Sequence, residues 1–178
     1  MNYYFSVKSK VGDNTQRIFD LVYNKIVHPD DKVIGFFDSY GGSAKVASRI
    51  VEKIIPLSEP GLISFIAIGG EKIFSAAAFI FSSFNKRFAF EDSNFLIHPS
   101  VPPRGEERNT LYGVFDLQVW GYMSAFLGKI SLEELSELAA QNKIISATRA
   151  LEIGLVHRIF DGSYKDKDRI LKKEGLLL

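Results

Sequence analysis

Residues 32–42 read KVIGFFDSYGG, a nearly continuous apolar run that ends at a glycine pair. An apolar run of this length is typical of a strand covered on both faces, as the central strands of parallel sheets are. The next residues, 43–54, place apolar side chains at helical spacing with charged side chains opposite them, and the pattern stops before Pro56. A buried strand, a tight turn and an amphipathic helix together predict one step of an α/β fold.

The same order of elements repeats on both sides of this segment. Upstream, we expect a strand over residues 4–8 and a helix capped by Asp13 and Asn14. Downstream, the predicted elements are a strand over 62–68, a turn at Gly69 and Gly70, a buried helix over 75–84, and strands over 87–90 and 93–97. This alternation of strands and helices predicts the α/β class with a mostly parallel sheet.

The second half of the chain is expected to be mainly helical. Residues 115–130 carry an apolar stripe wider than one core contact requires, which indicates a surface for a partner. Ser131 opens a capping box for the helix that follows, and residues 146–153 predict a short helix closed by Gly154. We expect a strand over residues 155–160 at the edge of the sheet.

Length and composition limit the class of protein. The 178 residues fit a single domain, 1–178, in which residues 163–178 form either a short helix or, as we expect, a solvated tail. The 22 Lys and Arg residues nearly balance the 21 Asp and Glu residues, so we expect no nucleic-acid partner. No apolar stretch reaches the ~20 residues of a membrane helix, and no signal peptide is recognisable, so we expect a cytoplasmic protein that binds no membrane. The absence of cysteine excludes thiol nucleophiles and thiolate metal sites.

Four residues of the predicted α/β fold point to chemistry. Gly41 and Gly42 follow the buried strand, Ser75 begins a buried helix, and His98 ends a strand. A hydroxyl nucleophile, an imidazole base and backbone N–H groups for an oxyanion are the parts of a serine acyl-transfer site. Each also has a simpler interpretation: the glycines can form a tight turn, the serine can cap its helix, and the histidine can bond a backbone carbonyl.

Three longer segments contain these residues. They are DSYGGSAKVASRI (38–50), FSAAAFIFSSFNKRFAFEDSNFLIHPS (74–100) and ISLEELSELAAQNKIISATRALEIGLVHRIF (130–160). In order and in approximate spacing they resemble the proteolytic subunit of the Clp protease, and the resemblance covers about residues 4–160. It implies the Clp/crotonase fold, with repeated ββα units and a projecting helical arm.

The resemblance implies a role for each site residue. Ser75 matches the nucleophile of the family, and His98 matches the general base. Gly41 and Ala76 match the residues whose N–H groups stabilise the oxyanion, and Gly42 lies where the substrate binds as an added strand. The resemblance implies no cofactor and no metal.

The chain departs from the family pattern where the third triad member is expected. Asn142 stands at the position of an aspartate, and an amide oxygen orients an imidazole less strongly than a carboxylate does. Asn142 can also be a turn residue that satisfies backbone groups. Bulky Phe74 precedes Ser75 and is expected to narrow the peptide site. Other departures are Tyr40 for proline, Pro99 for glutamine, Arg149 for glutamate and His157 for aspartate.

The resemblance and its departures leave several functions to weigh. We expect a Clp-like serine endopeptidase that cleaves unfolded or extended polypeptides through an acyl-enzyme, weakened by Asn142. The alternatives are a catalytically silent Clp-like structural subunit and a crotonase-type acyl-CoA enzyme. A Ser-Lys dyad would instead use Lys72 or Lys86 as its base.

The expected partners follow from the same resemblance. We expect a polypeptide substrate and a homo-oligomeric ring, with stacking of two rings left open. The chain begins almost at its first predicted strand, without the axial loops that contact an ATP-dependent unfoldase in the family. This start argues against such a partner.

Overall fold

The structure is a computed structural model that describes residues 1–26, 28–58, 62–98 and 130–177. The predicted arm helix over 115–130 falls, except for its last residue, outside these ranges, as does Pro99. The strands of the described part are β1 (Asn2–Val7), β2 (Lys32–Ser39), β3 (Ser64–Phe74), β4 (Lys86–Phe90), β5 (Asn94–Leu96), β6 (Ile144–Ser146) and β7 (Arg158–Phe160). The helices are α1 (Asp13–Tyr23), α2 (Ala44–Ile54), α3 (Ala76–Ser82), α5 (Leu132–Gln141), α6 (Ala147–Glu152) and α7 (Lys167–Lys173), with 3-10 turns at Ile55–Leu57 and Tyr164–Asp166.

The strands form one mostly parallel sheet in the order β1-β2-β3-β4-β7. The long strand β3 pairs with β4 through residues 66–69 and with β5 through residues 72–74, and β5 pairs with β6. All of these ladders are parallel except that between β5 and β6. The predicted α/β class is therefore confirmed. Because β2, β3 and β5 are parallel, their carboxyl ends meet at one end of the sheet, where ligands of α/β proteins commonly bind.

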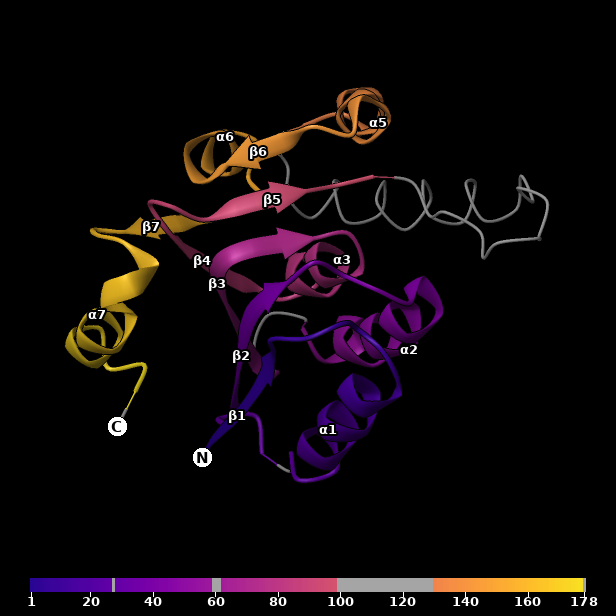
Figure 1. Ribbon diagram of the computed structural model, residues 1–178. Coiled ribbons are helices and arrows are strands. Elements are labelled where there is room, and N and C mark those ends of the chain that lie inside the picture. The colour runs from indigo at the N-terminus through magenta and orange to yellow at the C-terminus, as the bar shows by residue number, and fades with distance from the viewer. Residues whose placement is uncertain (27, 59–61, 99–129, 178) are drawn as a thin grey trace.

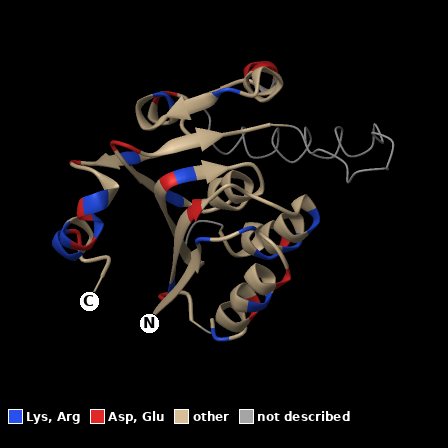
Figure 2. Cartoon of the chain, viewed as in Figure 1, with Lys and Arg blue, Asp and Glu red and all other residues tan. Residues whose placement is uncertain are grey.

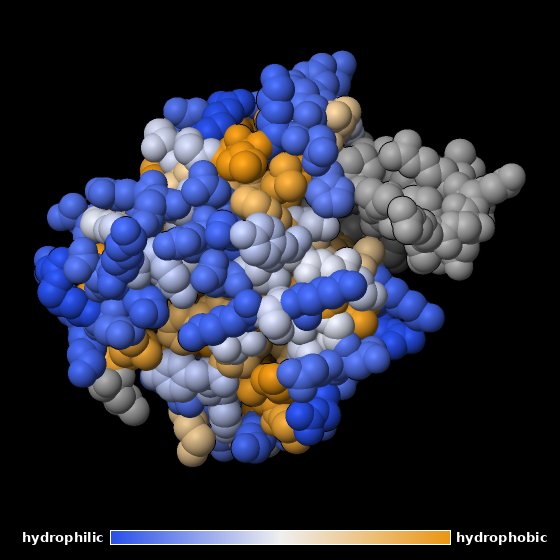
Figure 3. Space-filling view, viewed as in Figure 1, coloured by the Kyte–Doolittle hydropathy of each residue, from blue (hydrophilic) through white to orange (hydrophobic). Residues whose placement is uncertain are grey.

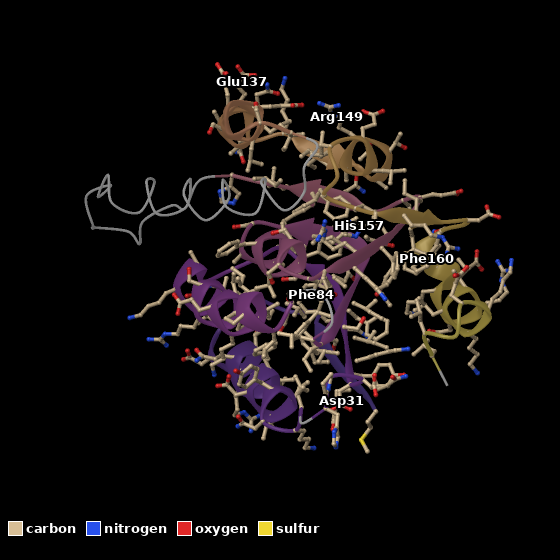
Figure 4. All side chains as sticks on the ribbon, turned by 180° about the vertical axis from the view of Figure 1, so that it is seen from behind. Asp31, Phe84, Glu137, Arg149, His157 and Phe160 are labelled. Carbon is tan, nitrogen blue, oxygen red and sulfur yellow. The ribbon has the colours of Figure 1, made fainter. Side chains whose placement is uncertain are left out.

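Each face of the sheet carries its own core. Helices α1, α2 and α3 lie along one face, over a cluster rich in phenylalanine that includes Phe37 and Phe84, whose ring centroids are 5.4 Å apart (Figure 1). Figure 4 shows Phe84 among the side chains between these helices and the strands. Helix α7 covers a second, smaller cluster on the other face, formed by Ile34, Ile66, Ile68, Phe90, Phe160, Ile170 and Leu171.

Charged residues of both signs occur along the helices and at some positions of the strands (Figure 2). The face seen in Figure 3 is a mixture of polar side chains and separate apolar areas. Among the helices of the described ranges, none combines the length and the apolar character needed to span a bilayer.

The predicted turn at Gly69 and Gly70 is wrong, because β3 continues through both residues to Phe74. The glycines are explained by close packing instead. A Cβ added to Gly69 would lie 2.9 Å from Ile73 Cδ1, and one added to Gly70 would lie 2.8 Å from Asp38 Cβ. The strand is therefore longer than predicted and carries its last residues to the end of the sheet where the candidate site lies.

The predicted helix termini are largely confirmed. The Ser131 hydroxyl accepts the N–H of Glu134 at 3.1 Å, and the Ser146 hydroxyl caps α6 in the same way. The N-cap of α1 is Gly12 rather than Asp13, which is the first residue of that helix. Strand β7 is shorter than predicted but lies at the edge of the sheet, as expected.

The C-terminal residues do not form the solvated tail that we expected. They form α7, in which Ile170 and Leu171 are 5% and 1% exposed. Many lysines in this segment suggested solvation, but two adjacent apolar residues suffice to attach one short helix to the sheet. The alternative of a short helix is therefore the correct one.

A carboxylate fastens the start of this C-terminal segment to the sheet. Asp92 follows β4 and accepts hydrogen bonds from the Ser163 hydroxyl at 2.6 Å and from the Tyr164 N–H at 2.8 Å. Partial burial of Asp92 opposes its ionisation, but these two hydrogen bonds outweigh it and lower the pKa of the carboxyl group. The segment that leads to α7 is thus held by an ionised group.

Asp92→Asn is expected to lower the free energy of unfolding by about 1 kcal/mol at pH 7, because one charged acceptor is lost. The Asp92 pKa is lower in the folded protein than in the unfolded chain. This contribution is therefore present above about pH 4 and lost as the pH falls through the folded pKa. Urea unfolding of both proteins at pH 7 and pH 3.5 measures the difference, with exposed Asp161→Asn as a control. A difference that persists unchanged at pH 3.5 would contradict this assignment.

Candidate active site

Ser75 lies at the junction of β3 and α3, with an unusual backbone conformation. Its φ of 54° and ψ of −124° place it in a region that non-glycine residues rarely occupy. Although it occupies the N-cap position of α3, its side chain makes no capping hydrogen bond. The N-cap residues Ser43, Ser131 and Ser146 all accept such a bond. The capping interpretation of Ser75 is therefore not supported, and its hydroxyl is not used by its own helix.

The backbone of Ser75 is held from two sides. Its N–H donates to the carbonyl oxygen of Leu96 in β5 at 2.7 Å, and its carbonyl oxygen accepts the N–H of Phe79 at 3.0 Å. All residues of α3 are buried. A sharp strand-to-helix turn with this support presents a serine at the end of a sheet, as nucleophile elbows do.

Gly41 packs directly against Ser75. A Cβ added to Gly41 would lie 2.6 Å from Ser75 Cβ and 3.0 Å from the nitrogen of Ala76, and the φ of Gly41 is +94°. Both the space and the conformation therefore require glycine. The structure brings together Ser75 and the two predicted oxyanion residues, Gly41 and Ala76.

The N–H of Gly41 has a partner in this structure. It donates to the hydroxyl oxygen of Ser39 at 3.1 Å. The N–H of Ala76 lies in the first turn of α3, where backbone N–H groups have no acceptor within the helix. Of the two predicted oxyanion donors, Gly41 is thus already engaged by a side chain that the sequence analysis did not single out.

Gly42 forms an exposed backbone edge next to this turn. It forms a parallel bridge with Val11, in which the Val11 N–H donates to the Gly41 carbonyl and the Ser43 N–H donates to the Val11 carbonyl. In such a bridge the N–H and C=O of Gly42 itself point away from Val11. Gly42 is exposed, so these two groups are on a side of the turn that solvent can reach.

His98 and Asn142 lie at matching positions beyond the β5–β6 ladder. The last pair of this antiparallel ladder joins Leu96 to Ile144. His98 is two residues after Leu96, and Asn142 is two residues before Ile144, so continuation of the register would set them opposite each other. Phe74 pairs with Leu96 on the other side of β5, which brings the end of β3 to the same place. The topology thus brings Ser75, His98 and Asn142 to one end of the sheet. These are the candidates for the nucleophile, the general base and the residue that orients the base.

Asn142 has a structural role of its own. It is the C-cap of α5 in the left-handed conformation, with φ 49° and ψ 41°, and its N–H donates to the carbonyl of Ala139 at 3.3 Å. Asparagine is one of the few residues that tolerate this conformation. The turn interpretation of Asn142 is therefore confirmed. Asn142 also lies two residues before the β5–β6 ladder, so its role in orienting the His98 imidazole stays a prediction.

An ion pair joins the two helices on either side of Asn142. Arg149 on α6 donates to Glu134 on α5 at 2.9 Å and to Glu152 at 3.0 Å (Figure 4). Hydrogen bonding to Glu152 raises the pKa of the Arg149 guanidinium, although exposure to solvent limits its effect on stability. Arg149 thus links α5 to α6 by an ion pair.

An aromatic pair lies next to the candidate nucleophile. The rings of Tyr40 and Phe74 are 5.8 Å apart in an edge-to-face arrangement, and Tyr40 is 71% exposed. The Lys72 ammonium lies 5.0 Å from the centre of the Tyr40 ring. A hydrogen bond with Tyr40 raises the pKa of Lys72, which makes this lysine a poorer general base.

Lys86 is remote from the candidate site. It pairs with Ile66, nine residues before Ser75 on extended β3, which corresponds to about 30 Å along the strand. The structure therefore does not support a Ser-Lys dyad within this chain that uses Lys86.

A second polar cluster surrounds buried Arg87, which is 5% exposed. Its Nε donates to the Leu155 carbonyl at 2.8 Å, Nη2 donates to the Gly154 carbonyl at 3.2 Å, and Nη1 donates to the Phe84 carbonyl. The Nε2 atom of the His157 imidazole lies 2.8 Å from Nη2 (Figure 4). Burial lowers the pKa of Arg87 to about 10, so the guanidinium remains charged at neutral pH. This cluster joins β4 to the segment between α6 and β7 and lies apart from Ser75.

Within the described ranges, no group of three or more His, Cys, Asp or Glu side chains is arranged to hold a metal ion. The chain matches no model of a known protein family, and it matches no curated protein. Inference about its function therefore rests on its residues and their geometry.

Proposed function

We propose that this chain is a serine endopeptidase of the Clp/crotonase fold, with Ser75 as nucleophile and His98 as general base. The observation that carries the proposal is the backbone of Ser75, a non-glycine residue at φ 54° whose hydroxyl does not cap its helix. Strained residues of this kind cluster at active sites, where the strain presents a reactive group. The packing of Gly41 against Ser75 and Ala76 supports the same site.

The reaction proceeds through an acyl-enzyme. Ser75 Oγ forms a bond to the scissile carbonyl carbon while its proton passes to His98. The carbonyl oxygen becomes an oxyanion, which the N–H of Ala76 at the positive end of α3 stabilises. The C–N bond then breaks, and His98 returns the proton to the leaving amine. Water attacks the ester in the second half of the reaction and regenerates Ser75.

The substrate of this proposal is an extended polypeptide. The exposed N–H and C=O of Gly42 can each pair with the backbone of an added strand. Such pairing recognises the main chain and therefore accepts many sequences. Tyr40 and Phe74 lie beside this edge and set the width available to side chains of the substrate.

The proposed function is tested by a fluorophosphonate probe, which reacts with activated serine hydroxyls. Incubation of the full chain with the probe, followed by digestion and mass spectrometry, should place the label on Ser75. Light scattering during size-exclusion chromatography measures the mass in solution in the same preparation, because the proposed assembly is a homo-oligomeric ring. No label on Ser75 in a folded, ring-sized assembly would contradict the peptidase proposal.

Asn142→Asp is expected to raise the rate of labelling of Ser75 about tenfold, since a carboxylate orients the imidazole and stabilises its charged form. Asn142→Gly is the matched control, because glycine also adopts the left-handed conformation of this helix end but carries no side chain. The glycine variant should keep the stability of the wild type and be labelled more slowly. An aspartate variant labelled no faster than the wild type would remove Asn142 from the site.

A second candidate function is a catalytically silent Clp-like subunit that is kept for assembly. Two features favour it: asparagine stands at position 142, where the resemblance implies an aspartate, and the N–H of Gly41 is engaged by Ser39. This candidate predicts a stable oligomer that is not labelled at Ser75, even when residue 142 is aspartate.

A further inference from the structure

The hydroxyl of Ser39 has two hydrogen bonds of fixed direction. Ser39 is the last residue of β2 and is 2% exposed. Its oxygen lies 2.6 Å from the carbonyl oxygen of Ser9 and 3.1 Å from the nitrogen of Gly41. A carbonyl only accepts and an amide N–H only donates. The Ser39 proton therefore points to Ser9, and a lone pair of its oxygen holds the N–H of Gly41.

The other backbone groups of this turn are fixed by Val11. The Gly41 carbonyl accepts the Val11 N–H at 2.8 Å, and the Ser43 N–H donates to the Val11 carbonyl at 2.9 Å. The peptide between Tyr40 and Gly41 is different, because its N–H is held by a side chain. Tyr40 is 71% exposed and Gly41, as a glycine, adopts a wider range of φ than other residues, which permits a rotation of this peptide although Gly41 itself packs against Ser75.

We propose that Ser39 is a positioning residue that controls the reactivity of Ser75 by holding the N–H of Gly41 away from the oxyanion. This inference rests on the proposed peptidase function. Gly41 contacts Ser75, so a rotation of its N–H takes place beside the nucleophile. One N–H cannot serve the Ser39 oxygen and a substrate oxyanion at full strength at the same time. The site is complete when this N–H leaves Ser39, and a single oxyanion donor is worth roughly 10²–10³ in turnover.

The consequence is a substitution that activates the site. Ser39→Ala removes the competing acceptor and shifts the Gly41 N–H toward the oxyanion. The rate constant for fluorophosphonate labelling of Ser75 is expected to rise about fivefold, which corresponds to the net strength of one buried hydrogen bond. Ser39→Thr keeps a hydroxyl and should stay within about twofold of the wild type. A residue that merely braced the turn would have the opposite effect, because its loss would slow labelling.

The experiment compares wild type, Ser39→Ala and Ser39→Thr by the second-order labelling rate, with urea unfolding to confirm that each is folded. If the alanine variant does not fold, Ser39→Cys replaces it, because a sulfur atom is a weaker acceptor of similar size and should also accelerate labelling. Labelling of wild-type Ser75 without acceleration in the folded variant overturns the role of Ser39 and leaves the peptidase intact. Absence of label on Ser75 in every protein overturns the proposed function and the role of Ser39 together.

Discussion

Ser75→Ala is expected to abolish labelling by fluorophosphonates and to lower peptidase turnover by about 10⁴-fold or more, as loss of a triad nucleophile does. The reason is that alanine carries no hydroxyl to form the acyl-enzyme at the junction of β3 and α3, beside Gly41 and Ala76. Hydrolysis of an unfolded polypeptide that carries a quenched fluorophore measures turnover. Circular dichroism should show an unchanged fold, because the Ser75 side chain makes no capping hydrogen bond and the substitution removes only one oxygen atom.

Ser43→Ala is the matched control for this experiment. Ser43 caps α2 at the same end of the sheet, and its hydroxyl accepts the Val46 N–H at 3.3 Å. Its loss should cost about 1 kcal/mol of stability but leave Ser75 labelled. Turnover that survives in Ser75→Ala, or that disappears equally in Ser43→Ala, would contradict the assignment of the nucleophile.

Arg87→Met is expected to lower the free energy of unfolding by about 3–5 kcal/mol, because it leaves three buried carbonyl groups without donors. These are the carbonyls of Phe84, Gly154 and Leu155. Methionine has similar length, so the effect measures lost hydrogen bonds more than lost volume. Denaturant unfolding gives the difference directly.

Arg158→Met provides the comparison for Arg87. Arg158 lies on the adjacent strand β7, and its side chain is 54% exposed and paired with Glu174 at 2.6 Å. Exposed ion pairs of this kind contribute about 0–1 kcal/mol. If Arg87→Met and Arg158→Met lowered the free energy of unfolding equally, the carbonyl groups around Arg87 would have found other hydrogen-bond donors.

The fold was predictable from sequence where apolar spacing determines the structure. Residues 33–37 and the Ala-rich helix before Phe84 are buried except for half-buried Phe36, and their uninterrupted apolar character indicates this. The glycines at 69 and 70 were misleading, because the local preference of glycine for turns does not reveal the side chains of Ile73 and Asp38, which lie within 3 Å of the positions that their Cβ atoms would take. Strand β6 was missed since three residues provide too little periodicity to detect.

The candidate site was predictable only in part. Ser75, Gly41 and Ala76 were selected from the sequence, and the structure packs them together. Ser39 was not predicted as a site residue. Nothing in the sequence around a serine at the end of a strand indicates that its hydroxyl accepts a hydrogen bond from the N–H two residues later, here that of Gly41. The left-handed conformation of Asn142 has a recognisable cause in helix termination, but its position two residues from the β5–β6 ladder depends on the pairing of β5 with β6.

The positive φ of Ser75 lowers the stability of the fold at the same residue whose hydroxyl the proposed reaction requires. A serine in this conformation costs folding about 1–3 kcal/mol, whereas glycine would adopt it freely. Selection of this chain for thermal stability alone would therefore favour the replacement of the residue that its proposed reaction requires. A thermostable descendant of this protein would be the variant in which activity should be measured first.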